Sequence, residues 1–178
     1  NKDVLTRNIN DFLLKNVDLV ISVSKASLTD LNSLFSFTKN KSIVIPVGIE
    51  EKPKIDRTIS NSPFRNKEIF NLIHIGSFTK EKNHIGLIKI FKNILSQDRN
   101  VHLNLIGGGP MLPNIKNTVD RMGIKNNIDF WGDIEDPQIY LSHADALLLP
   151  SKIEGLPGVI LEAMYNQTPV IAYNVGGV

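Results

Sequence analysis

Short apolar runs alternate with amphipathic stretches along most of the chain. The apolar runs have strand length and are rich in Ile, Val and Leu, which is typical of strands buried on both faces. We predict strands at residues 17–23, 42–45, 69–75, 101–106, 128–131, 146–149 and 169–172. Helical spacing of apolar residues, with Ser24 and Pro113 suited to helix starts, predicts helices at 24–34, 83–97, 112–122, 137–142 and 158–166.

The alternation of strands and helices predicts βαβ units and therefore a parallel sheet. Because such crossovers are right-handed, we expect an α/β fold with a Rossmann-like, doubly wound sheet. One polar stretch interrupts the alternation between Glu50 and Lys67, and it contains Pro53 and Pro63. We interpret residues 47–67 as a hinge or linker between a first part, 1–46, and a second part, 68–178.

The composition agrees with a globular protein and excludes several classes of function. Apolar residues make up 42% and charged residues 21% of the 178 residues, and the net charge is +2. So small a charge gives little support to a nucleic-acid binder. No apolar run approaches the length of a membrane span, and no secretory signal pattern is present. The absence of cysteine excludes disulfides and thiolate metal sites and fits a reducing compartment.

In a doubly wound fold the ligand lies beyond the carboxyl ends of the strands, so four loops are candidates. They read GSFTKEKNH, GGGPML, WGDIEDP and PSKIEGLPG. Gly107 and Gly109 match the first two glycines of a dinucleotide fingerprint, but Leu112 occupies the third position. No Gly-Lys-Ser/Thr follows, so a phosphate-binding P-loop is excluded as well. These glycines would still let a ligand approach the backbone closely.

The remaining motifs give weak or negative signals. Lys80 and Lys82 lie just past a strand and could meet a phosphate, although charge alone favours a solvated loop. The histidines lack the spacing of metal ligands, so no metal site is predicted, and two of them lie inside strands; they are His74, His84, His102 and His143. No Gly-x-Ser-x-Gly motif supports a serine hydrolase.

The stretch SKIEGLPGVILEAM places Glu154 before a predicted helix start and Glu162 inside the helix. Amides of residues 156–160 at that start would attract an anion such as a diphosphate. A fully helical interval would separate the glutamates by about 12 Å, too far for an acid–base pair on one bond. The pair suits opposite ends of an elongated, hydroxyl-bearing ligand. The spacing alone slightly favours the alternative that the two glutamates are a loop charge and an ordinary helix charge.

Taken together, these segments resemble the GT-B-fold retaining glycosyltransferases of glycosyltransferase family four, also called glycosyl transferases group 1. PSKIEGLPGVILEAMYNQTPVIAYNVGG resembles the family's E-x7-E segment, with Glu154 and Glu162 on its two glutamates. IHIGSFTKEKNHIGLIKIF is similar to its diphosphate loop, LNLIGGGPML to its Gly-x-Gly-Pro turn, and IDFWGDIEDPQIYLSHADALLLPS to the segment before E-x7-E. VDLVISVSKASLTDL and SIVIPVGIE resemble the end of the acceptor domain and its hinge.

The resemblance implies an enzyme that transfers a sugar, with retention, from a nucleotide diphosphate sugar to a glycan or lipid-linked acceptor, as in surface polysaccharide synthesis. Glu154 and Lys82 would be catalytic, with Glu154 on the transferred sugar and Lys82 on the diphosphate. Glu162 would hold the ribose, and the backbone near Trp131 would receive the base. Residues implied to bind the donor are Gly76, Ser77, Lys82, Gly107, Gly109, Trp131, Gly132, Asp133, Glu154, Gly155, Leu156, Pro157, Gly158, Val159 and Glu162.

The resemblance also implies that no metal or other cofactor is needed and that no nucleic acid is bound. The location would be cytoplasmic, or peripheral on the inner face of the membrane. Residues 68–178 would be the donor-binding domain, truncated at its end, and 1–46 the remnant of the acceptor-side domain. We expect such a fragment to be inactive alone.

One residue departs from the family pattern. Ser77 stands where the family usually has an arginine, and a hydroxyl cannot make a charged, bidentate contact with phosphate. Two alternatives therefore remain beside the transferase: a non-catalytic nucleotide-sugar-binding module, and a nucleotide-sugar epimerase of the same architecture.

Overall fold

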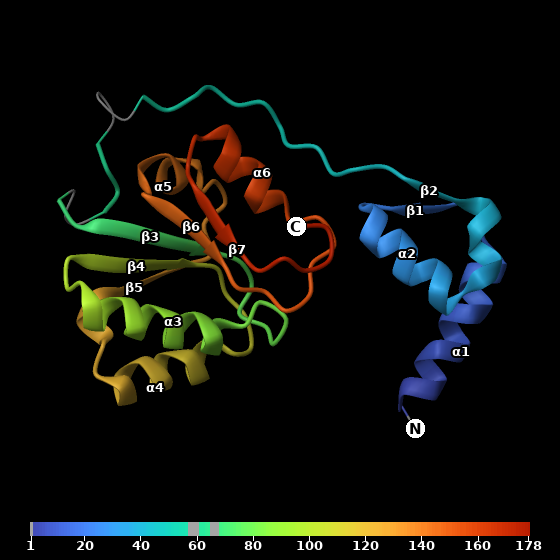
Figure 1. Cartoon of the computed structure of the whole chain (residues 1–178), viewed down its shortest axis with the longest axis horizontal. Coiled ribbons are helices and arrows are strands. Elements are labelled where there is room, and N and C mark those ends of the chain that lie inside the picture. Colours follow the sequence, from blue (N-terminus) through green and yellow to red (C-terminus); the bar gives the residue numbers. More distant parts are fainter. Residues whose placement is uncertain (1, 57–60, 65–67) are drawn as a thin grey trace. The chain divides into compact units, whose positions relative to one another are not determined.

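The computed structural model describes residues 2–56, 61–64 and 68–178. The chain forms two compact units (Figure 1). The first unit comprises Asn1–Gly48 with the short segments Glu154–Pro157 and Gly176–Val178. The second comprises Ile49–Ile153 and Gly158–Val175. The predicted linker lies partly outside the described residues, at 57–60 and 65–67.

The first unit contains two short parallel strands, β1 (Val20–Ser22) and β2 (Ser42–Val44), with Val20 paired to Ser42. Helix α2 (Lys25–Leu34) follows β1, and its Ser24 cap accepts a hydrogen bond from the Ser27 amide at 3.1 Å. The two predicted strands and the Ser24 cap are thus confirmed. Helix α1 (Lys2–Lys15) and the 3-10 helix η1 (Ser36–Lys41) are additional elements that the pattern did not predict.

The second unit is built on a five-stranded parallel sheet with the order β5-β4-β3-β6-β7. The strands are β3 (Phe70–Ile75), β4 (Val101–Ile106), β5 (Ile128–Gly132), β6 (Ala146–Leu149) and β7 (Val170–Ala172). The chain builds the sheet outward from β3 to β5, returns to pair β6 with β3, and ends on β7. This topology confirms the predicted doubly wound α/β fold.

Helices cover both faces of this sheet (Figure 1). On one face, α3 (His84–Gln97) and α4 (Leu112–Met122) bury Leu87, Phe91 and Ile115 against the strands. On the other, α5 (Gln138–His143) and α6 (Gly158–Tyr165) contribute Leu141 and Ala163 to a second cluster. A short 3-10 helix, η2 (Lys125–Asn127), leads into β5. Because the strands are buried on both faces, they read as continuous apolar runs in the sequence.

The predicted elements differ from the observed ones mainly at their ends. The first strand is shorter than residues 17–23, because the chain is still turning after α1, where the Asn16 amide donates to the Leu13 carbonyl. The predicted helix at 158–166 ends at Tyr165. Among the described residues, no helix combines the length and the apolar character needed to cross a bilayer.

Candidate functional site

Two of the candidate loops lie directly against each other at the carboxyl ends of β3 and β4. The amide of Phe78 donates to the Gly108 carbonyl at 2.7 Å. The amide of Met111 donates to the Phe78 carbonyl at 2.9 Å. Both bonds join backbone to backbone, so the first loop is fixed on the second with no space for a side chain between them.

The glycines of the second loop make this contact possible. Gly107 has φ +129° and Gly109 has φ +142°, both in the region that favours glycine. A Cβ at Gly107 would overlap the carbonyl oxygen of Gly76, and one at Gly109 would lie 2.8 Å from the amide nitrogen of Phe78. The close approach that these glycines permit is therefore to the backbone of the first loop.

The third loop joins the same assembly. The amide of Gly107 donates to the Gly132 carbonyl at 2.8 Å, and Gly132 has φ +73°. The carboxylate of Asp133 lies so close to Gly108 that a side chain there would overlap it. The structure thus brings together the predicted residues Gly76, Gly107, Gly109, Gly132 and Asp133.

The first loop also presents Lys82 in a defined place. Its Cδ and Cε lie 3.5 and 3.6 Å from the position that a Cβ of Gly76 would occupy, and its side chain is half-buried. Lys80 and Ser77 are exposed. The loop is tied to the exit of β6, because the Asn83 side-chain amide donates to the Pro150 carbonyl at 3.0 Å. Of Lys80 and Lys82, only Lys82 therefore has a side chain that packs against the loop backbone.

Two histidines are packed underneath this loop. The ring of His84 stacks on Phe78 at a centroid distance of 3.9 Å and meets His74 edge to face at 4.7 Å. His74 Nδ1 lies 2.8 Å from the Leu148 carbonyl oxygen. Burial lowers the pKa of His84 to about 3, and the charges of His74 and Lys82 act in the same direction. His84 is therefore neutral at any physiological pH.

The depressed pKa predicts how stability depends on pH. An unfolded histidine takes up a proton near pH 6.5, whereas folded His84 does so only near 3. The free energy of unfolding should therefore fall as the pH drops from 6.5 toward 3, by no more than about 1.4 kcal/mol per pH unit from this residue. Urea unfolding measured at several pH values across this range should show that the free energy of unfolding falls less steeply with decreasing pH in His84→Leu than in wild type. Equal pH dependence of the free energy of unfolding in wild type and His84→Leu would contradict the prediction.

Glu162 lines a pocket of about 180 Å³ in the second unit. Its floor and walls come from the segment after β5, from α5 and α6, and from the start of the second unit; the other lining residues are Ile49, Glu50, Lys52, Glu135, Asp136, Pro137, Gln138, Leu141, Tyr165 and Asn166. The pocket is rich in carboxylates, which accept hydrogen bonds from hydroxyl groups. A pocket with this lining suits a ligand that bears several hydroxyl groups.

Side chains from distant parts of the sequence hold Lys52, which lines the pocket, and its neighbour Pro53. Lys52 Nζ lies 3.1 Å from Asp136 Oδ2, and the Gln138 side chain donates to the Pro53 carbonyl at 2.9 Å. The Tyr165 hydroxyl donates to the Lys52 carbonyl. The hydrogen bond between Lys52 and Asp136 raises the pKa of Lys52 and lowers the pKa of Asp136, so both stay charged.

Sequence reasoning did not name Lys52, Asp136 or Gln138 as site residues, although Asp136 lies in the candidate loop WGDIEDP. Lys52 falls in the stretch interpreted as linker, and 84 residues separate it from Asp136. Nothing in the local pattern distinguishes this lysine from a solvated charge. The polar character of the stretch, together with Pro53 and Pro63, predicted a hinge or linker there.

The other predicted residues divide between the two units. Glu154, Gly155, Leu156 and Pro157 group with the first unit, where Gly155 lies against Val23 and the carbonyls of Glu154 and Gly155 lie against Gly176 and Gly177. Gly158 begins α6 in the second unit. The Val159 side chain is partly buried and packs against the core cluster of the second sheet face.

Within the described residues, no three His, Asp or Glu side chains are grouped as a metal site. His102 instead faces Asp129, with Nε2 and Oδ2 3.2 Å apart. The charged groups of the candidate site are thus carboxylates and lysines.

The chain shows similarity to curated glycosyltransferases. An uncharacterized glycosyltransferase, MJ1059 of Methanocaldococcus jannaschii, is 28% identical over 90% of this chain and 41% of its own length. The O-antigen biosynthesis glycosyltransferase WbnH of Escherichia coli is 29% identical over 92% of this chain and 47% of its own. The chain spans less than half the length of these relatives.

A solved structure shares the fold. The Anabaena protein HepE, determined in complex with UDP and glucose, matches 97% of this chain and 48% of its own with a TM-score of 0.78 and 23% identity. The agreement identifies the parallel sheet and its helices as a GT-B architecture. The family model for glycosyl transferases group 1 matches residues 56–178, which is more than half of the chain. This chain therefore belongs to the glycosyl transferases group 1 family, as the resemblance of its loops predicts.

Proposed function

We propose that the protein containing this chain is a retaining glycosyltransferase that moves a sugar from a nucleotide diphosphate sugar to a glycan or lipid-linked acceptor. Residues 68–178 supply the donor site, and residues 1–46 belong to the acceptor-side domain. The carboxyl ends of β3, β4 and β5 meet in one interlocked loop assembly beside the pocket that contains Glu162. This assembly is the observation that carries the proposal.

In the proposed mechanism, Glu162 accepts hydrogen bonds from the ribose hydroxyls and the backbone after Trp131 receives the base. Lys82 and the amides at the start of α6 stabilise the diphosphate as it departs. Glu154 binds hydroxyls of the transferred sugar. A lysine and a helix N-terminus can offset the developing charge in this way, so the proposal requires no metal ion.

The proposed setting is surface polysaccharide synthesis at the cytoplasmic side, with peripheral contact to the membrane. Support comes from WbnH, whose name assigns it to O-antigen biosynthesis. The HepE complex with UDP and glucose supports a nucleotide-sugar donor.

The direct test is calorimetric titration of the full-length protein with UDP, GDP and ADP. We expect one of the three to bind with a dissociation constant below about 1 mM, which corresponds to roughly 4 kcal/mol of binding free energy. The matching nucleotide sugar should then be consumed in the presence of an acceptor. Absence of binding by all three nucleotides at millimolar concentration would exclude this function.

A second candidate, a non-catalytic nucleotide-sugar-binding module, is motivated by Ser77. Its side chain is exposed in the first loop, where the family usually carries an arginine. Ser77→Arg should tighten binding of the nucleoside diphosphate about tenfold, because a charge-assisted phosphate contact contributes more than 1 kcal/mol. Calorimetry measures the change, with Ser77→Ala as the neutral control.

The calorimetry of Ser77→Arg, combined with a sugar-transfer assay, distinguishes the transferase from the binding module. Product formed by the wild-type enzyme ends the binding-module alternative. An unchanged affinity in Ser77→Arg would mean that position 77 does not reach the diphosphate.

A further inference from the structure

Trp131 is the extra residue of a β-bulge at the end of β5. Leu105 pairs with Phe130 and Ile106 pairs with Gly132, so Trp131 has no partner in the ladder with β4. Gly132 follows with φ +73°. A bulge re-aims a side chain and bends the strand, and here it does so where the strand leaves the sheet toward the pocket.

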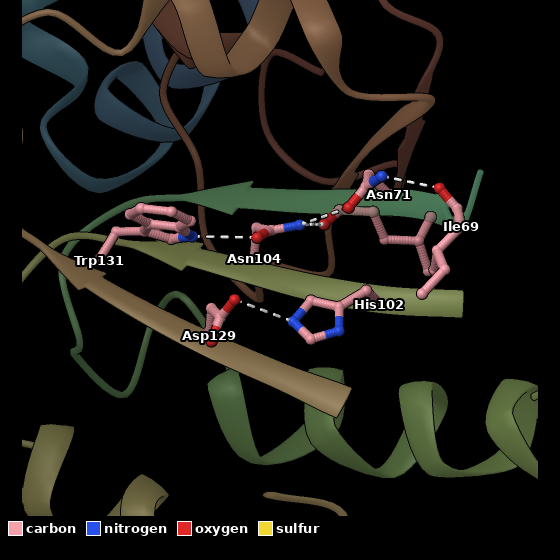
Figure 2. Close-up of polar contacts among 7 residues, drawn as sticks. Ile69, Asn71, His102, Asn104, Asp129 and Trp131 are labelled. Carbon is pink, nitrogen blue, oxygen red and sulfur yellow. Dashed lines mark hydrogen bonds and ion pairs between the residues drawn. The ribbon is translucent and has the colours of Figure 1, made fainter. Parts of the chain in front are cut away.

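A buried asparagine holds the side chain of this bulge residue (Figure 2). The Trp131 indole N–H donates to Asn104 Oδ1 at 3.0 Å. The side-chain amide of Asn104 in turn donates to Asn71 Oδ1 and to the Leu72 carbonyl, both at 3.3 Å. Asn71 donates to the Ile69 carbonyl at 2.7 Å, so the chain of hydrogen bonds ends on the backbone before β3.

Asn104 is only 1% exposed. It occupies the middle of β4, between the buried residues Leu103 and Leu105. A polar side chain at such a position is tolerated because its amide and its carbonyl are both satisfied. The network therefore fixes the orientation of the indole more tightly than apolar packing would, since a hydrogen bond has a direction and an apolar contact has none.

Two structural connections link the position of Trp131 to the lining of the pocket. The indole meets the Tyr140 ring edge to face at 5.0 Å, and α5, which carries Tyr140, supplies Gln138 and Leu141 to the pocket lining. The chain after Gly132 leads directly to Glu135 and Asp136, which also line the pocket. Both the helix and the loop that form one side of the pocket therefore depend on where Trp131 lies.

We propose that Asn104 is a positioning residue of the nucleoside pocket, which acts by holding the Trp131 bulge through the indole hydrogen bond. This inference rests on the proposed function of that pocket. Asn104 touches no ligand itself. Its loss should weaken donor binding while the chemical step, carried by Lys82 and Glu154, stays unchanged.

The test compares Asn104→Leu with wild type in the full-length protein. An ¹⁵N–¹H spectrum of the indole groups, with the Trp131 resonance assigned through Trp131→Phe, reports directly on the hydrogen bond. We expect that resonance to move and its hydrogen exchange to accelerate. We expect the KM for the donor and the dissociation constant of the nucleoside diphosphate to rise about tenfold, with kcat within about twofold of wild type.

Thr118→Val is the matched control. It also removes a buried side-chain hydrogen bond, from Thr118 Oγ1 to the Asn114 carbonyl at 2.8 Å, but on α4 of the opposite sheet face. It should lower the melting temperature without changing the KM for the donor. The double variant Asn104→Leu with Trp131→Phe removes both polar partners, so it should lose less free energy of unfolding than the sum of the losses in the two single variants.

Three results would overturn the proposal. One is an Asn104→Leu variant with a shifted indole resonance and an unchanged KM. Another is a parallel change of stability and KM in Asn104→Leu and Thr118→Val, which would make the role purely structural. The last is a wild-type protein that binds no nucleoside diphosphate; this result alone also removes the proposed function, whereas the first two leave it intact.

Discussion

Lys82→Met is expected to lower kcat for sugar transfer by about 100- to 1000-fold, the loss typical of removing one preorganised charge from a developing anion. The physical reason is its position: the aliphatic part of Lys82 lies against Gly76 on the first loop, at the carboxyl end of β3. Methionine keeps the packing of the chain and removes only the charge. Initial rates with saturating donor and acceptor measure the effect.

Lys80→Met is the control for this prediction. Lys80 lies in the same loop but is exposed, so its removal should change kcat by less than about threefold. Equal losses in the two variants would indicate general electrostatic attraction of the donor. A Lys82→Met enzyme with wild-type kcat would remove Lys82 from the proposed mechanism.

Gly107→Ala is expected to lower the free energy of unfolding by about 3 kcal/mol and to weaken nucleotide binding. The alanine Cβ would overlap the carbonyl oxygen of Gly76, and the φ of +129° is unfavourable for any side chain. Relief of the clash has to separate the first loop from the second, and Lys82 moves with the first loop. Urea unfolding and calorimetric titration measure the two effects.

Gly123→Ala is the control that separates backbone strain at positive φ from the steric overlap of a new Cβ. Gly123 ends α4 with φ +69°, but a Cβ there meets nothing within 4 Å. This variant should lose only about 1 kcal/mol of stability and bind nucleotide as wild type does. If Gly107→Ala and Gly123→Ala behave alike, the interlocking of the loops contributes nothing beyond the backbone conformation.

Most of the fold of the second unit was predictable because its signals are local. A strand buried on both faces needs a continuous apolar run, and a helix on a sheet needs one apolar stripe, so each element is marked by its own residues. The parallel order then places the loops at one edge of the sheet. Helix α1 was not predicted, and its side chains Ile9 and Phe12 are exposed rather than packed in a core.

By itself, the sequence determined the family, the alternation of strands and helices, and which loops gather at the site. Only the tertiary structure decided what those loops contact. It set the Gly107 and Gly109 turns against the backbone of the first loop, joined Lys52 to Asp136 across 84 residues, and placed Asn104 under the Trp131 bulge. Periodicity and capping depend on neighbours along the chain, whereas these contacts depend on which strands pair and in which register. A single sequence carries no mark of such distant partners.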